Sequence, residues 1–303
     1  MEKKRIDLHM HSLYSDDGEY SPADLVRMCK EQGIQVMAIA DHNSVRANEE
    51  AEEAARAMGI TYIPAIEIDC VFQGVNLHVL GYGIDSQSED FKWIEHNIDS
   101  QSMEASYQML RATQEMGFQV TKGDMEKLEE SCFWKGRWTG EMFAEVLLKK
   151  PEYEDHPILK DYRKGGSRSD NPYVNFYWDF YSQGKPCYVK MEYPGLEKTV
   201  EMIHRSKGKA VLAHPGVNLK NREVLLMPVI LTGMDGIEAF SSYHSPAQCD
   251  HFYRQARRGG LFVTCGSDFH GKTKPAIHLG STGCCEEENE ILDGLKKSGL
   301  ITG

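Results

Sequence analysis

The sequence predicts an α/β fold, a closed or nearly closed β/α barrel of TIM type that is interrupted by a helical insertion. Strand patterns alternate with helical patterns at both ends of the chain, which is typical of βα units and parallel strands. A central interval, residues 98–186, shows no strand pattern. Histidines and acidic residues recur where the predicted strands end, as expected for a barrel with its site at the carboxyl ends of its strands.

The first half of the predicted barrel begins with a strand. Residues Ile6 to His11 alternate apolar and polar side chains, as a strand with one buried face does. Ser21 and Pro22 supply the N-cap and the first residue of a helix that should end at Gly33. A strand, a helix and two further strands are then predicted at residues 36–41, 44–58, 61–69 and 75–83. Two βα units therefore precede a pair of adjacent strands.

The alternation resumes near the C-terminus. Helices and strands follow one another at residues 196–207, 209–214, 236–240, 246–258, 261–267 and 287–298. The interval between the halves holds a long polar helix pattern around 102–116 and an aromatic run at 173–181. We therefore expect residues 1–97 and 187–303 to form a discontinuous barrel domain, with 98–186 as a helical insertion capping the site. The aromatic run should fill a small core of the insertion rather than stack on bases.

Composition narrows the function classes. The 303-residue chain is 41% hydrophobic and 26% charged, which is typical of a soluble globular protein. Its formal net charge of −12 argues against a long nucleic acid as the main partner, because phosphate-backbone binding needs a basic surface. No apolar stretch has membrane-spanning length, and the N-terminus lacks the apolar region of a secretory signal. Eight cysteines without a Cys-x-x-Cys pair predict reduced thiols in a cytoplasmic protein. The oligomeric state stays open.

Two histidines at the end of the first predicted strand are the first sign of a metal site. His9 and His11 are two positions apart, so both imidazoles lie on one face of the strand and can reach a single ion. A strand that ends in two solvated histidines is the alternative. The same spacing recurs near the last predicted strand, at Asp268 and His270. This recurrence favours the metal site.

Further metal-capable residues end or follow the predicted strands, except His78, which falls within the strand at 75–83 on its polar side. They are Asp16, Asp41, His42, Glu67, His78, His214, Glu238 and His244. In a barrel these strand ends meet at one rim, where catalysis is normally sited. Imidazoles and carboxylates without thiolates suit Mn, Fe or Zn in a catalytic site rather than a structural zinc. So many donors predict two or three divalent ions.

Four motifs resemble those of the PHP (polymerase and histidinol phosphatase) family of metal-dependent phosphoesterases. They are His9-Met-His-Ser12, Ala40-Asp-His-Asn43, Ala213-His-Pro215 and Gly266-Ser-Asp-Phe-His-Gly271. The resemblance covers residues 1–85 and 187–283. It implies a distorted seven-stranded β/α barrel with a trinuclear metal site.

The resemblance also implies how the ligands divide among three ions. The first ion would be held by His9, His11, Glu67 and Asp268. Glu67 would bridge to a second ion that His78 and His214 also hold. The third set would be Asp16, His42 and His270. Asp41 is expected in the catalytic set as a partner that orients a ligating histidine.

The family branch with a helical insertion acts on nucleoside monophosphates, 3′,5′-bisphosphate nucleotides or short oligonucleotides, and its insertion carries an Arg-Pro-His element facing the substrate phosphate. Here Arg137-Trp138-Thr139 keeps the arginine and lacks the histidine. We expect Arg137 to bind a non-bridging phosphate oxygen bidentately. His244 is a candidate for holding the phosphate or protonating the leaving alcohol, and Lys274 for attracting the anion. A satisfied rim histidine and ordinary loop solvation are the alternatives for these two residues.

These features predict a phosphoesterase that hydrolyses a phosphomonoester of a small nucleotide, of the AMP or 3′,5′-bisphosphate type, by attack of a metal-bridging hydroxide. A 5′-3′ exonuclease on short oligonucleotides and a histidinol-phosphate-type phosphatase are alternatives. A third class is a metal-binding module without catalysis, or an amidohydrolase-like enzyme acting on a C–N bond. The complete set of expected ligands argues against a module that has lost catalysis. Lys190, the only strand lysine near the rim, lacks a motif typical of amidohydrolases.

Overall fold

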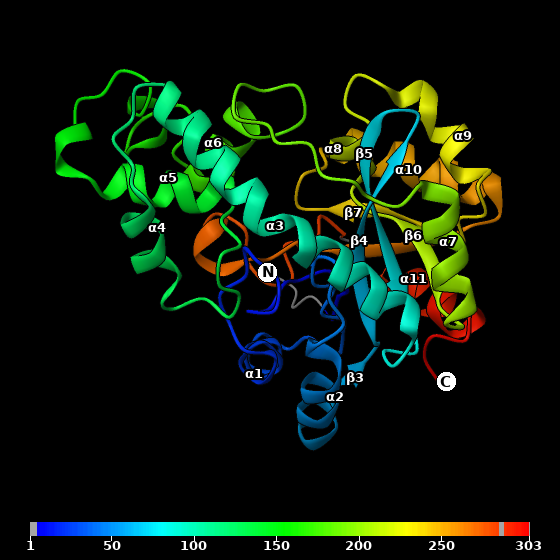
Figure 1. Cartoon of the computed structure of the whole chain (residues 1–303). Helices are drawn as coiled ribbons and strands as arrows, with labels where there is room; N and C mark the ends of the chain where they lie inside the picture. Colours follow the sequence, from blue (N-terminus) through cyan, green and yellow to red (C-terminus); the bar gives the residue numbers. More distant parts are fainter. Residues whose placement is uncertain (1–4, 285–287, 303) are drawn as a thin grey trace.

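The computed structural model describes residues 5–284 and 288–302 and shows the expected α/β fold, with two sheets surrounded by helices (Figure 1). The first sheet contains three short parallel strands, β1 (Ile6–Asp7), β2 (Val36–Met37) and β3 (Thr61–Tyr62). The second sheet has the order β4 (Ala65–Phe72), β5 (Val75–Tyr82), β6 (Lys209–Leu212), β7 (Gly236–Ser241) and β8 (Phe262–Gly266). The strands lie within or beside the predicted segments, but β1 and β2 are shorter than predicted and end at Asp7 and Met37, before His9, His11 and Asp41.

The second sheet departs from the expected parallel arrangement at β5, which is antiparallel to both β4 and β6. The reason lies in the connection. Only Gln73 and Gly74 join β4 to β5, whereas a parallel pair needs a long crossover. Both residues have positive φ, 49° and 78°, as a two-residue hairpin turn of type I′ requires. The strands β6, β7 and β8 are parallel, as predicted.

Backbone hydrogen bonds join the two sheets at both edges. Beside β1, the N–H of Leu8 donates to Cys265 (3.0 Å) and that of Asp268 donates to His9 (2.7 Å). Beyond β2, the N–H of Glu67 donates to the carbonyl of Asp41 at 3.1 Å. The residues that follow β1, β2 and β8 are thereby brought next to β4, so the motifs that contain histidine converge.

Helices flank the sheets at the positions that the sequence predicts. These are α1 (Pro22–Gln32), α2 (Ala47–Met58), α7 (Leu196–Arg205), α10 (Pro246–Gly259) and α11 (Glu288–Lys297). Shorter helical turns lie between them, namely α8 (Pro215–Asn218), α9 (Leu226–Ile230), η3 (Glu223–Leu225) and η4 (Gly271–Thr273). The side chain of Ser21 caps α1, and Gly33 ends it with a φ of 85°. None of the described helices combines the length and apolarity needed to cross a membrane.

The central interval is helical. It contains α3 (Glu89–Glu115), α4 (Lys122–Glu129), α5 (Gly140–Lys149), α6 (Pro172–Phe180), η1 (Pro151–Tyr153) and η2 (Lys160–Tyr162). Residues 98–186, all of them described, contain no strand. The helix α3 starts before the expected boundary, because Ser88 caps it, and runs from the sheets toward α4–α6 (Figure 1). Phe176 and Tyr181 of the aromatic run are buried in a separate apolar cluster with Phe143.

Candidate metal centre

Glu67, on β4, is the carboxylate around which the predicted histidines gather. Its side chain is fully buried. Five imidazoles lie within 3.3 Å of its two oxygens, those of His9, His11, His42, His78 and His214. Burial alone would raise the pKa of Glu67, but the charges of His9, His42 and His78 hold it well below its usual value. One acid thus faces histidines that lie on, or follow, strands of both sheets.

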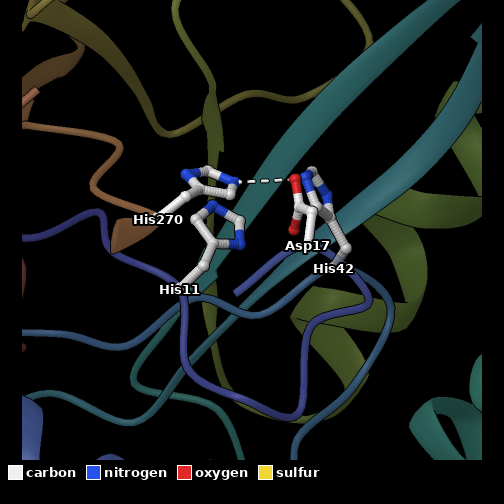
Figure 2. A group of neighbouring side chains, drawn as sticks. All are labelled: His11, Asp17, His42 and His270. Atoms are coloured by element: carbon white, nitrogen blue, oxygen red, sulfur yellow. Dashed lines mark ion pairs between the residues drawn. The ribbon is translucent and has the colours of Figure 1, made fainter. Parts of the chain in front are cut away.

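Four sets of side chains have ligand atoms that all lie within 4.8 Å of one another. They are His9, His11, Glu67 and Asp268; Glu67, His78 and His214; His11, Asp17, His42 and His270; and His42, Asp69 and His78. We call these ten residues the candidate metal centre. The first two sets bring together the residues that the family resemblance groups around the first two ions. Figure 2 shows the third set.

The third set contains Asp17 where the sequence analysis expected Asp16. An oxygen of Asp17 lies 3.1 Å from Nε2 of His270 (Figure 2). Its other oxygen accepts a hydrogen bond from the Ser15 hydroxyl (3.0 Å). The loop turns back sharply at this point, since a Cβ on Gly18 would lie 2.0 Å from the carbonyl oxygen of Ser12. Of the two adjacent acids, only Asp17 belongs to the set. Asp16 is half-buried nearby, and burial with the charge of Asp17 raises its pKa to about 6.

Several of the gathered histidines have a second ring nitrogen that contacts a residue other than Glu67. Nδ1 of His9 lies 2.9 Å from Glu238, and Nδ1 of His11 lies 3.2 Å from the Ser15 hydroxyl. Nε2 of His78 lies 3.0 Å from Asp69. Such contacts fix the tautomer and orientation of a ligating imidazole.

Sequence reasoning left Glu238 without a firm role and overlooked Asp69. Glu238 also accepts the backbone N–H of His214 at 2.7 Å, so it supports two of the gathered histidines. The sequence signal for Glu238 is that it is the only acid in the otherwise apolar strand β7. Asp69 stands two positions after Glu67 on β4, the same spacing as His9 and His11, and that spacing could have identified it.

The donor sets fit divalent ions. Nδ1 of His42 and Nε2 of His270 are buried, and neither has a hydrogen-bond partner among the described residues. Both nevertheless lie within 3.3 Å of carboxylate oxygens, those of Glu67 and Asp17. Buried nitrogens that approach carboxylates without hydrogen-bond geometry are what an ion between them would satisfy.

His244 and Asp41 do not have the roles expected of them. Nδ1 of His244 contacts the carbonyl of Ala239 at 2.9 Å, and its Nε2 accepts the N–H of Gly216 at 3.0 Å. With both nitrogens engaged, this histidine has no proton for a leaving group and fits the alternative of a satisfied rim residue. Asp41 accepts both the N–H and the hydroxyl of Ser12 at 2.6 Å, so it holds the chain after His11 rather than a histidine ring. Burial raises the pKa of Asp41 to about 7.

The two expected substrate cations differ in their surroundings. Lys274 is buried, and its Nζ lies 2.7 Å from Oδ2 of Asp268, so it pairs with the centre rather than with solvent anions. Nε and Nη2 of Arg137 both donate to Asp99, at 3.2 and 2.9 Å. Its guanidinium also lies over the ring of Trp134, 3.6 Å from the ring centroid.

Imidazoles and carboxylates that cluster in this way beside the sheets of an α/β fold are typical of metal-dependent hydrolases. The PHP domain family matches residues 7–206, and the chain belongs to this family. The resemblance seen in the motifs is thereby confirmed.

Similar proteins extend over almost the whole chain. A 5′-3′ exoribonuclease of Haemophilus influenzae is 29% identical over 270 residues, 88% of this chain and 90% of that protein. A 3′,5′-nucleoside bisphosphate phosphatase of Chromobacterium violaceum is 28% identical over 283 residues, 91% of each chain. A solved structure described as a metal-dependent phosphoesterase, from Bifidobacterium adolescentis, has a TM-score of 0.75 and 26% identity and covers 95% of this chain and 94% of its own.

Proposed function

We propose that this protein is a metal-dependent phosphoesterase that hydrolyses the phosphomonoester of a small nucleotide, of the nucleoside monophosphate or 3′,5′-bisphosphate type. The observation that carries the proposal is the position of Glu67. One of its oxygens faces His9, and the other faces His78 and His214, at 3.0–3.1 Å. A carboxylate shared between two donor sets suits a site with several ions, the arrangement used by many phosphatases. The similarity to a nucleoside bisphosphate phosphatase supports the substrate class.

We assign three ions to the donor sets. His9, His11, Glu67 and Asp268 would hold the first, and Glu67, His78 and His214 the second. Asp17, His42 and His270 would hold the third, with Asp17 in place of Asp16. Nitrogen and oxygen donors of this kind accept Mn, Fe or Zn.

Divalent ions bound at this centre would lower the pKa of water and neutralise charge on the phosphoryl oxygens. The residues of the chain orient the ligating side chains and the substrate. Glu238 and Asp69 fix the rings of His9 and His78 so that the opposite nitrogens face Glu67. Arg137, held flat by Asp99 and Trp134, would bind a phosphate oxygen with the edge of its guanidinium that these two residues do not use. The charge of Arg137 tends to lower the pKa of Asp16, the acid next to Asp17, which supports a place for Arg137 close to the centre.

The barrel and its insertion are part of the same proposal. Taken as one strand interrupted at Pro64, β3 and β4 make seven strands with the other six. The hydrogen bonds that join the sheets at both edges support a closed, distorted barrel. The separate apolar cluster within residues 98–186 supports an inserted subdomain, with the barrel domain formed by residues 1–97 and 187–303.

A 5′-3′ exonuclease acting on short oligonucleotides is the second candidate, because a relative of this kind aligns with 88% of the chain. It would use the same ions but needs contacts for several phosphates. The net charge of −12 disfavours long substrates.

One panel of assays tests the proposal. The purified protein is analysed for bound metals and for phosphate release from AMP, adenosine 3′,5′-bisphosphate, histidinol phosphate and a short 5′-phosphorylated oligonucleotide. Phosphate from the mononucleotides with an intact oligonucleotide is the expected result. Stepwise release of mononucleotides would favour the exonuclease instead, and preference for histidinol phosphate would overturn the nucleotide assignment.

A matched pair of variants tests the centre itself. His11→Ala should lower the metal content and reduce turnover at least 100-fold, on the order expected when a metal ligand is lost. His251→Ala, on the exposed face of α10, is the control and should keep the metal content and the turnover of the wild type. Full activity in His11→Ala would refute the ligand assignment.

A further inference from the structure

We propose that Tyr243 and Lys274 are positioning residues that together occupy Oδ2 of Asp268 and leave only Oδ1 to the metal-binding set. The inference rests on the proposed metal centre. It goes beyond that centre because it assigns a role to two side chains that belong to none of the donor sets.

The two oxygens of Asp268 have separate partners. The hydroxyl of Tyr243 donates to Oδ2 at 2.5 Å, and Nζ of Lys274 donates to the same oxygen at 2.7 Å. Oδ1 lies 3.0 Å from Nε2 of His11 and 3.3 Å from Nε2 of His9. Nδ1 of His270 is also 3.7 Å from Oδ1, so one oxygen faces two donors from outside the donor sets and the other faces the gathered imidazoles. The geometry therefore presents Asp268 to an ion through a single oxygen.

The surroundings make this contact strong. Asp268 and Lys274 are only 3% and 6% exposed, so the charge of the lysine is withdrawn from water and needs its partner. In the part of the chain that the structure describes, Lys274 is the only lysine or arginine paired with a carboxylate of the candidate metal centre. The backbone at Asp268 is fixed independently, with a φ of 58° and its N–H bonded to His9. Tyr243 and Lys274 then set the direction of the side chain.

Tyr243 also links the centre to the helical part of the chain. Its ring lies edge-on to that of His214 and to that of Trp178 on α6, with ring centroids 5.8 Å apart in both cases. Nζ of Lys274 lies 5.4 Å from the centroid of the same ring. The tyrosine is held by these packing contacts, so removal of its hydroxyl alone leaves an unpaired position on Oδ2 and little else.

Cobalt binding to the full-length protein tests the inference without an activity assay. Metal-stripped Tyr243→Phe and Lys274→Met are titrated with Co²⁺ and followed by calorimetry and visible absorption. We expect roughly 10–100-fold weaker binding of one ion, the usual effect of losing a partner that orients a ligand. Each variant frees one of the two positions on Oδ2, and an ion that also binds through this oxygen gains a ligand, which should weaken the cobalt absorption bands. Lys274→Arg keeps a charged donor and should restore most of the affinity.

Lys272→Met is the matched control, because Lys272 lies on the same loop but pairs with Glu145 on α5. It should bind Co²⁺ like the wild type. Wild-type affinity and an unchanged spectrum in Tyr243→Phe would overturn the inference, and this variant decides the question even if Lys274→Met does not fold. Failure of the wild type itself to bind Co²⁺ would instead overturn the proposed centre, and with it this inference.

Discussion

At the scale of single residues, the centre is built from carboxylates that each serve more than one partner. Glu67 faces five histidines, and Glu238 contacts both the ring of His9 and the backbone of His214. A buried carboxylate is costly unless its oxygens are paired, so each shared contact offsets part of the cost of burying the others. The loss of one such acid therefore affects several histidines at once.

The choice between two adjacent acids gives the first prediction. Asp17→Asn should remove one ligand of the third set and lower the metal stoichiometry by one ion at limiting Mn²⁺, because an amide oxygen is a weaker ligand than a carboxylate. Asp16→Asn is the matched variant and should keep the stoichiometry, since Asp16 belongs to no donor set. Equilibrium dialysis with metal analysis measures both. If Asp16→Asn lowered the stoichiometry and Asp17→Asn did not, Asp16 would be the ligand, as the family resemblance implies.

A second prediction concerns pH and Glu141, in the first turn of α5. Burial, and then the charge of Asp17, raise its pKa from 4.5 to about 8. The folded chain keeps this proton while the unfolded chain loses it, so stability should fall as the pH rises from about 4.5 to 8. Glu141→Gln imitates the protonated acid. In metal-stripped protein it should raise the free energy of unfolding by on the order of 2 kcal/mol at pH 8 and change it little at pH 4.5. Urea denaturation at the two pH values would show this, and equal gains at both would contradict it.

The sequence could predict most of the donors but not all their roles. His9 and His11 are two positions apart, a spacing that predicts a shared face in extended chain, and both do face Glu67 although β1 ends at Asp7. Asp17 could not be separated from Asp16, because the direction of each side chain depends on how the loop packs against Ser12. The role of His244 depends on the N–H of Gly216, a contact that no sequence pattern reports.

At the scale of elements, the two ends of α1 were predictable because their signals are local, whereas the start of α3 at Glu89 was missed. Ser21 and Gly33 cap α1 through residues only a few positions apart. The direction of β5 was harder to predict, because alternating apolar residues look alike in parallel and antiparallel strands. The two-residue Gln73-Gly74 connection carried the missing information, since so short a link can only form a hairpin.

That hairpin gives a prediction at the same scale. Gln73 is exposed and adopts a φ of 49°, a conformation that costs a long side chain more than it costs asparagine. Gln73→Asn should therefore stabilise the protein by roughly 0.5–1 kcal/mol, the usual gain from matching a turn residue to its conformation. Urea denaturation of the two proteins measures the difference. Gln73→Val, which is branched at Cβ, is the opposite control and should destabilise the turn.

At the scale of the whole molecule, contacts between the helical interval and the loops of the centre hold the two parts together. The indole N–H of Trp134 donates to the carbonyl of Tyr14 at 2.7 Å, two residues before Asp16. Lys272, two residues after His270, pairs with Glu145 of α5 at 3.0 Å. Both contacts reach loops that carry donors of the third set. The apolar clusters remain separate, so these polar contacts help to hold residues 98–186 against the loops that carry the donors.

The overall charge gives the last prediction, which separates short substrates from long ones. An acidic protein repels a chain of phosphates, and added salt screens that repulsion, whereas a basic nuclease loses affinity in salt. With a net charge of −12, kcat/KM for a 5′-phosphorylated ten-nucleotide RNA should rise, by roughly 2–5-fold, between 50 and 300 mM KCl. The value for AMP should change less, because AMP carries far fewer charges. Initial rates at several salt concentrations measure both. A steep fall for the RNA would reveal a basic track along the protein surface and would favour a nuclease that follows an extended strand.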